Sequence, residues 1–187
     1  MTGPARSDAR ERLLVVASEL FYREGIHSVG VDRILTSAGV TRATMYRHFA
    51  GKEGLVVAYL DREDAVIKSY FEAAAAQGGS PAKLVERIID GVADDARRYH
   101  QRGCPFINAA AEYPDRDSAV RRVVERHRTW FKETLTSVLR AASVPRPAQA
   151  AAALVLLRDA TLVGVYLDGD AVTTTFRRTA RQVVGSP

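Results

Sequence analysis

The sequence predicts an all-α protein in which three short N-terminal helices, in helix-turn-helix order, are followed by six further helices. Apolar residues recur at spacings of three and four through most of the chain, the period of a helix packed on one face. No segment alternates apolar and polar residues as a half-buried strand would. With 187 residues and 47% apolar composition, the chain can bury one or two cores.

The first two helices are expected at residues 7–23 and 31–37. Ser7 is expected to cap the first helix and Gly25 to end it. The inward stripe of the first helix comprises Leu13, Leu14, Ala17, Leu20 and Phe21, and that of the second comprises Val31, Ile34 and Leu35. Both stripes are expected to share one core with the third helix.

The third helix is expected within residues 41–52, TRATMYRHFAGK, after the turn Ala38-Gly39-Val40. The segment contains no acid, and its basic residues are Arg42, Arg47, His48 and Lys52. A short helix of this charge, placed third after a glycine turn, can enter a DNA groove.

A helical wheel sorts the side chains of this segment by direction. At about 100° per residue, Met45 and Phe49 share the inward side. The opposite side carries Ala43, Thr44 and Arg47, with Tyr46 and His48 on the two flanks. In a major groove the outward side would meet base edges and the flanks would meet phosphates.

Residues 7–60 resemble the N-terminal domain of TetR-type (TetR/AcrR) bacterial transcriptional regulators. The resemblance rests on Gly25, Val31 and Ile34, followed by AGVTRATMYRHFAGKEGL. Two positions depart from the pattern, because Gly30 stands where Ser or Thr usually caps the second helix and Leu35 where a small residue is usual. Glycine is an acceptable cap without a side-chain bond.

The resemblance implies a role for each exposed position of the third helix. The residues implied to face bases are Arg42, Ala43, Thr44 and Arg47, and those implied to hold phosphates are Thr41, Tyr46, His48 and Lys52. The wheel independently gives most of this assignment. Arg42 lies nearer the buried side of the wheel, so it must reach outward by its length.

The composition fits a polyanionic partner and excludes several classes of site. The formal charge is +5, and residues 1–52 hold eight Lys or Arg against five acids. Residues 1–6 lack the pattern of a signal peptide and are expected to form a disordered arm, and the single cysteine fits a reducing cytoplasm. The sequence has no phosphate-binding loop or metal-ligand spacing, so no cofactor and no metal are expected.

The remaining helices are expected at residues 52–76, 81–101, 105–113, 117–142, 148–167 and 170–184. Gly78-Gly79-Ser80-Pro81, Pro114, Pro145 and Gly169 mark the breaks between them. We expect a DNA-binding domain at 7–66, which includes the start of the fourth helix, and a six-helix regulatory and dimerisation domain at 67–187.

Residues 148–167 form an apolar stretch that Arg158 and Asp159 interrupt near its middle. The two charges argue against a membrane span, so we expect a buried helix and no membrane partner. The helix is apolar nearly all round, and Ala160 and Gly164 would let a second helix approach. The resemblance implies a homodimer that forms through the last two helices. Its two DNA-binding domains would lie about 34–36 Å apart on a palindromic operator.

Polar and aromatic residues on the inward faces of the later helices are candidates for an effector cavity. The predicted ligand-binding residues are Phe106, Asn108, Glu112, His127, Trp130, Phe131 and Arg158. They could line a cavity, as the resemblance implies, or satisfy one another in an ordinary core. The favoured interpretation is a homodimeric repressor that a small-molecule effector releases from its operator.

Cys104 is the residue on which the alternative functions, a thiol sensor or a small enzyme, depend. It follows Arg97, Arg98, His100 and Arg102 and precedes Pro105, where cations and a helix end favour a thiolate. It could act as a redox or electrophile sensor, as the nucleophile of a small helical enzyme with His100 as base, or only as a structural residue. A helical scaffold without DNA binding would leave the charge of residues 41–52 unexplained.

Overall fold

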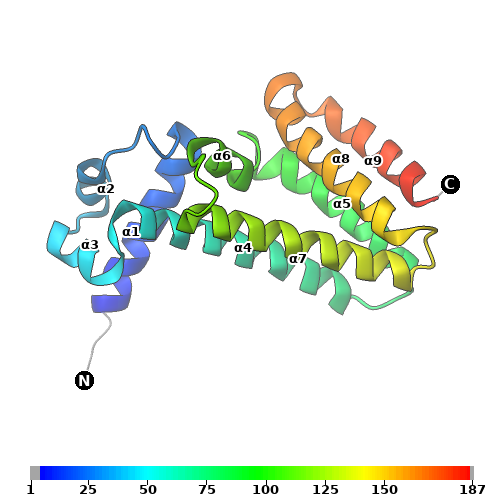
Figure 1. The fold of residues 1–187 in the computed structure, drawn as a ribbon, viewed down its shortest axis with the longest axis horizontal. Helices are drawn as coiled ribbons and strands as arrows, with labels where there is room; N and C mark the ends of the chain where they lie inside the picture. Colours follow the sequence, from blue (N-terminus) through cyan, green and yellow to red (C-terminus); the bar gives the residue numbers. More distant parts are fainter. Residues whose placement is uncertain (1–4, 186–187) are drawn as a thin grey trace. The chain divides into compact units, whose positions relative to one another are not determined.

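The computed structural model describes residues 5–185, and in this range the chain forms nine α-helices and no strand, which confirms the all-α prediction (Figure 1). The helices are α1 (Ala5–Glu24), α2 (Val31–Ala38), α3 (Arg42–His48), α4 (Gly51–Ala76), α5 (Pro81–Arg98), α6 (Pro105–Glu112), α7 (Ala119–Ala141), α8 (Pro147–Asp168) and α9 (Ala171–Val184).

Helix boundaries follow the capping residues, with one correction. Ser80 caps α5 by accepting a hydrogen bond from the Lys83 N–H at 3.4 Å, and Pro81 occupies the first helical position, as predicted. The expectation that Ser7 caps α1 was wrong, because the helix already begins at Ala5. Residues 1–4 of the expected N-terminal arm lie outside the described residues, and Ala5 and Arg6 are helical.

The helices divide into two compact units. The first unit comprises residues 1–64 and 105–125, and the second comprises residues 65–104 and 126–187. The end of the first segment, at Asp64, lies close to the domain boundary expected at 66. Residues 105–125, expected in the second domain, pack instead with the N-terminal helices.

In the first unit, α1, α2 and α3 share the core that their sequence period predicts. Leu13, Ile34 and Met45 are fully buried, one from each helix. Gly39 ends α2 in the left-handed conformation at φ 61°, and its N–H reaches the carbonyls of Leu35 and Thr36. This turn sets the direction in which α3 begins.

A side chain from α6 closes the turn between α1 and α2 in the same unit. The carboxylate of Glu112 accepts hydrogen bonds from the backbone N–H of Ile26 at 2.8 Å and of His27 at 2.5 Å. The His27 ring nitrogen Nε2 lies 2.6 Å from the Glu112 carbonyl oxygen. Gly25 precedes this contact at φ 92°, a conformation that a side chain would strain. Glu112 therefore pairs two backbone N–H groups of the turn that follows α1.

In the second unit, α5, α7, α8 and α9 surround a hydrophobic core that includes Ile89, Leu135, Leu139, Leu154 and Phe176. On α8, the Cβ that Gly164 lacks would lie 3.0 Å from Val172 Cγ1 on α9. The absence of a side chain at Gly164 is therefore what lets α9 pack closely on α8 of the same chain, where the two helices lie side by side in Figure 1.

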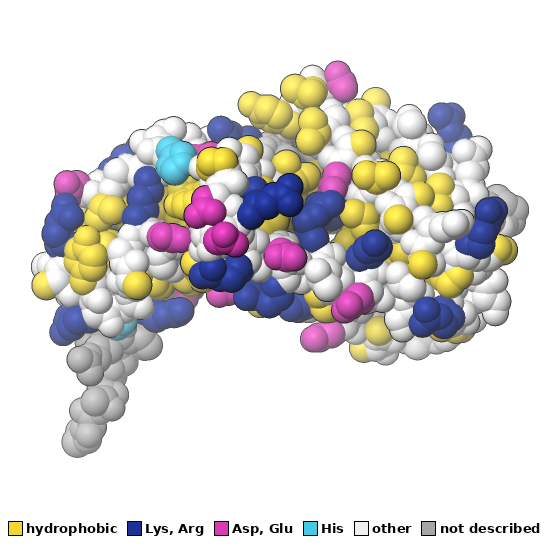
Figure 2. Space-filling model, in the orientation of Figure 1, with side chains coloured by type: hydrophobic (Ala, Val, Ile, Leu, Met, Phe, Trp, Pro, Cys, Tyr) yellow, Lys and Arg dark blue, Asp and Glu magenta, His cyan; other side chains and the backbone are white. Residues whose placement is uncertain are grey.

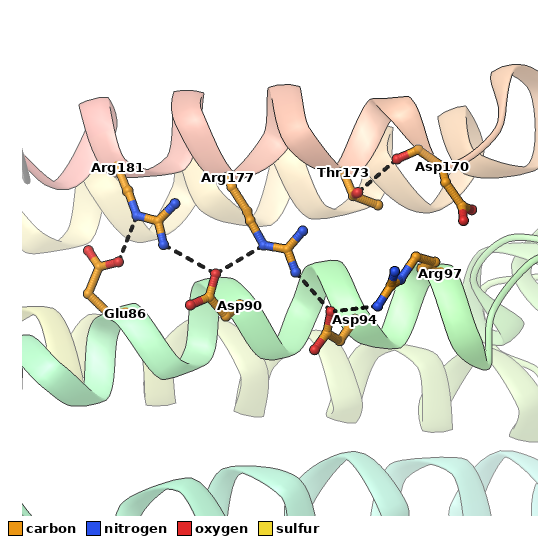
Figure 3. Close-up of polar contacts among 8 residues, drawn as sticks. All are labelled: Glu86, Asp90, Asp94, Arg97, Asp170, Thr173, Arg177 and Arg181. Atoms are coloured by element: carbon orange, nitrogen blue, oxygen red, sulfur yellow. Dashed lines mark hydrogen bonds and ion pairs between the residues drawn. The ribbon is translucent and has the colours of Figure 1, made fainter.

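Arginines of α9 and acids of α5 form a continuous ion-pair ladder in this unit (Figure 3). Arg181 contacts Glu86 at 2.7 Å and Asp90 at 3.2 Å. Arg177 contacts the same Asp90 oxygen at 3.0 Å and Asp94 at 2.8 Å. Since each arginine joins two successive acids, the ladder holds α9 along two turns of α5.

By length and composition α8 is apolar enough to cross a membrane. A core helix passes the same test. Arg158, at the middle of α8, is buried in the second unit with protein partners, which fits a core helix.

Candidate nucleic-acid interface

The inward side of α3 anchors the helix as the wheel predicts. Met45 is fully buried and Phe49 is 5% exposed. Thr41 caps the helix by accepting a hydrogen bond from the Thr44 N–H at 3.3 Å. Because core contacts and a cap fix α3 at both ends, the direction of its outer side chains is also fixed.

The outer side of α3 is free of core contacts. Arg42, Ala43, Tyr46 and Arg47 are exposed, and Thr44 is partly exposed. Arg47 donates from Nη2 to Thr44 Oγ1 at 2.9 Å, and Thr44 Oγ1 lies 2.9 Å from Thr41 Oγ1. Arg42 pairs with the exposed Asp32 of α2, which holds its guanidinium on the surface.

The predicted phosphate contacts differ in accessibility. Tyr46 is 56% exposed and Thr41 is exposed. His48 is partly buried, and its Nε2 is fully buried without a hydrogen-bond partner in the described part of the chain. Partial burial lowers the pKa of Lys52, and Glu112 opposes this shift. Lys and Arg side chains, dark blue in Figure 2, lie over the part of the first unit that holds α2 and α3.

A cavity of about 450 Å³ lies in the second unit. From α4 and the residue after it, the wall takes Ile67, Tyr70, Phe71, Ala73, Ala74 and Gln77. The other wall residues are nine between Arg87 and Tyr99, in α5 and the turn after it, together with Phe131 of α7 and Arg158 of α8. The volume lies within the range of about 300–1,000 Å³ that small-molecule sites occupy.

Two of the seven predicted ligand residues, Phe131 and Arg158, line this cavity. Trp130 lines a separate hollow of about 240 Å³, where Lys68 Nζ lies 5.1 Å from its ring centroid. His127 is buried and stacks on Phe131 with ring centroids 6.2 Å apart.

The other three predicted ligand residues, Phe106, Asn108 and Glu112, are outside the cavity wall because they belong to the first unit. The Glu112 carboxylate is already occupied by the turn after α1. Tyr70, Phe71 and Asp95, which do line the cavity, were not predicted as site residues. The sequence signal for Tyr70 and Phe71 is that both are aromatic residues on apolar faces of the fourth helix.

Cys104 and Arg158 form a buried polar contact in the second unit. Cys104 is 1% exposed, and its Sγ lies 3.7 Å from Arg158 Nη1. The His100 ring Nδ1 lies 2.7 Å from Asp95 Oδ2. A reactive thiol must be accessible to its substrate or oxidant, so the burial of Cys104 weighs against the sensor and enzyme interpretations.

The predicted dimerisation residues fall into different surroundings. Ala160 is exposed, on a face of α8 where Leu156, Val163 and Leu167 are 69%, 42% and 69% exposed. Gly164 faces Val172 of the same chain, so the helix that it admits is α9 and not a helix of a second copy. The exposed apolar stripe, defined by Leu156, Ala160, Val163 and Leu167, repeats every three or four residues.

The sequence matches two family models. Residues 13–59 match "Bacterial regulatory proteins, tetR family", and residues 82–168 match "Tetracyclin repressor-like, C-terminal domain". Both matches agree with the order of the helix-turn-helix and the later helices.

Solved structures and curated relatives similar to this chain are also transcriptional regulators. SCO4454, a TetR-family transcriptional regulator from Streptomyces coelicolor, is 42% identical, with a TM-score of 0.90 over 96% of this chain and 95% of its own. The reduced form of NemR from E. coli is 20% identical with a TM-score of 0.81 over 96% of this chain and 98% of its own, a likeness of fold. The transcriptional activator FasR from Mycolicibacterium smegmatis is 33% identical over 98 residues, which cover 50% of this chain but only 45% of FasR. The helix order, the two family matches and the full-length similarity to SCO4454 show that the chain belongs to the TetR family of DNA-binding helix-turn-helix transcriptional regulators.

Proposed function

We propose that the protein is a homodimeric repressor of the bacterial cytoplasm that binds a palindromic operator through α3 and is released by a small-molecule effector. The observation that carries the DNA-binding part is the fixed outer side of α3, where Arg42, Ala43, Tyr46 and Arg47 are exposed above the buried Met45. Arg42, Ala43, Thr44 and Arg47 then face bases, and Thr41, Tyr46, His48 and Lys52 hold phosphates. Since Nε2 of His48 is buried, its phosphate contact would use Nδ1.

A gel retardation assay with DNA from upstream of the protein's own gene tests these roles. Arg47→Ala should weaken binding to the operator by about 1–3 kcal/mol and leave binding to random DNA nearly unchanged, because a base contact is lost. Tyr46→Ala and Lys52→Ala should weaken both, and Lys52→Ala, which removes a cation, should reduce the salt slope by about 1. Arg140→Ala, at an exposed arginine of α7 in the second unit, is the matched control. Equal losses on both DNAs for all three variants would contradict the roles.

The sign of regulation needs a separate experiment, since the relative FasR is an activator by name. A reporter gene behind the same upstream DNA should be expressed more strongly when the regulator is deleted. Weaker expression on deletion would identify an activator.

The cavity in the second unit supports the effector part of the proposal. A ligand acts by binding the DNA-competent and DNA-incompetent states with different affinity. For a coupling of about 1–3 kcal/mol, operator affinity should fall roughly 5- to 150-fold. Narrowing the cavity at its α4 wall by Ala74→Trp should abolish release by an effector while leaving DNA retardation intact.

A further inference from the structure

Arg158 is a nearly fully buried cation on the wall of the 450 Å³ cavity. It is 5% exposed, and its Cζ lies 5.0 Å from the ring centroid of Phe131. Its hydrogen bonds to described residues both leave from Nη1, to Cys104 Sγ at 3.7 Å and to Asp159 Oδ1 at 3.2 Å. Nε and Nη2 therefore remain for another acceptor. A guanidinium presents such nitrogens as a planar fork that matches a carboxylate.

Arg158 shares its nearest carboxylate with a second arginine. Asp159 also pairs with Arg128 at 2.8 Å, so two arginines share one carboxylate. Burial acts to lower the pKa of Arg158, but Cys104, Asp159 and Asp95 together raise it by more, and the side chain stays protonated. The acids Asp90 and Asp94 on the cavity wall are already paired with Arg177 and Arg181 of α9 (Figure 3). An incoming carboxylate would therefore meet a guanidinium that shares its one ion pair with Arg128 and has Nε and Nη2 left to donate.

A second polar group of the same wall lacks a partner. Asp95 lines the cavity, and its Oδ2 contacts His100 at 2.7 Å. Its Oδ1 is fully buried and has no hydrogen-bond partner among the described residues. Asp95 acts electrostatically on Arg158, so the two groups lie in one neighbourhood. A buried carboxylate oxygen without a donor is costly, which a hydrogen-bond donor on a ligand would relieve.

The rest of the wall combines apolar and aromatic side chains with the polar residues Gln77, Arg87, Asp90, Asp94 and Arg98. Ile67, Phe71, Ile88, Val92 and Phe131 are its main hydrophobic contacts. Phe71 and Phe131 meet edge to face, with ring centroids 5.6 Å apart. These apolar and aromatic contacts suit the body of a ring-containing molecule whose carboxylate lies at Arg158.

We propose that the effector is a hydrophobic, ring-containing carboxylic acid whose carboxylate pairs with Nε and Nη2 of Arg158 and whose adjacent hydroxyl or amino group donates to Asp95. This inference rests on the effector-release function proposed above. It names the chemical class that this site selects.

Calorimetric titration of the full-length protein with three matched probes tests the inference: naphthylpropanoate, its α-hydroxy derivative and its primary amide. The acid should bind at least about 10-fold more tightly than the amide, because it gains a charge-assisted pair. The hydroxyl should add roughly 3- to 10-fold through Asp95. Equal affinities of acid and amide, or no saturable binding of any probe, would overturn the proposal.

Three variants assign the effects to residues. Arg158→Gln should remove the preference for acid over amide, and Asp95→Asn should remove the gain from the hydroxyl. Arg140→Gln, at an exposed arginine of α7 outside the cavity wall, should leave both within about twofold and is the control. A preference for the acid that survives Arg158→Gln would sink the inference. If Arg158→Gln does not fold, Arg158→Lys decides: it keeps the charge without the fork, so the acid should bind about 10-fold more weakly, and unchanged affinity contradicts the pairing.

The same protein preparations are assayed for DNA retardation without a probe. If the wild-type protein does not retard the DNA, the proposed function is contradicted. The calorimetric preference for the acid is measured without DNA, so it succeeds or fails on its own.

Discussion

Gly164 shows how one missing side chain fixes the packing of two helices. A Cβ at this position would lie 3.0 Å and 3.3 Å from the two methyl carbons of Val172. Valine is stiff about χ1 and cannot easily move aside. Gly164→Val should therefore destabilise the protein by about 1–3 kcal/mol relative to Gly91→Val, where no atom lies within 4 Å of the new Cβ. Urea unfolding measures both; equal losses would show that helix propensity alone decides.

Glu112 is the second residue whose role is set by distant partners. Glu112→Ala should cost about 2 kcal/mol, because the N–H groups of Ile26 and His27 lose a charged acceptor. Glu125→Ala, at an exposed site of the first unit, is the control and should cost less than about 0.5 kcal/mol. A comparable change in the free energy of unfolding for both variants would mean that the two hydrogen bonds contribute nothing.

The sequence predicted Met45, Phe49 and Arg47 correctly as inward and outward residues, since their positions depend only on the period of one helix. It misplaced Glu112, because the partners of this carboxylate lie 86 and 85 residues away along the chain. No local pattern reveals a contact at that separation. The same limit applies to Asp95, because its place in the site depends on α5 and α8 lining one cavity.

At the scale of helices, the α5–α9 ladder stabilises the pairing of two elements that the hydrophobic core also joins. Asp90 bridges both arginines, yet its side chain is 49% exposed, so solvent screens the pairs. Asp90→Asn should cost about 0.5–1 kcal/mol at about 0.01 M salt and much less at about 1 M salt. Glu133→Gln on the exposed face of α7 is the control. A loss that is independent of salt would point to packing rather than charge.

Helix positions were largely readable from the sequence, because Ser80-Pro81, Gly39 and Gly169 act locally at helix ends. The ladder was not predicted, although its signal is present in the sequence. Glu86, Asp90 and Asp94 recur every four residues, as do Arg177 and Arg181, and each set therefore lies on one side of its helix. Matching the two sets to each other required the order in which the helices pack.

For the whole molecule, the exposed stripe of α8 predicts the assembly state. Four apolar residues at helical spacing, exposed up to 69%, favour burial against a second copy. Leu156→Glu combined with Leu167→Glu should convert a dimer to a monomer in analytical ultracentrifugation. The double variant should also bind the operator at least about 10-fold more weakly, because a single DNA-binding domain contacts only one half-site. Val66→Glu, at an apolar site of α4 that is 40% exposed, should leave both unchanged. A double variant that remains dimeric would place the interface elsewhere.

The return of residues 105–125 to the first unit was the part of the whole molecule that the sequence did not predict. The chain enters the second unit at residue 65, returns to the first at 105 and leaves it again after 125. Breaks at Gly78, Pro114 and Pro145 mark where helices stop, but they carry no information about which helices pack together. The order of contacts along the chain is a tertiary property.

The hold of Glu112 on the turn after α1 has a consequence for protein engineering. A chimaera that transplants only residues 1–64 onto another regulator would leave the amides of Ile26 and His27 without their acceptor. The portable cassette is discontinuous and must include residues 105–125, grafted together with the N-terminal helices.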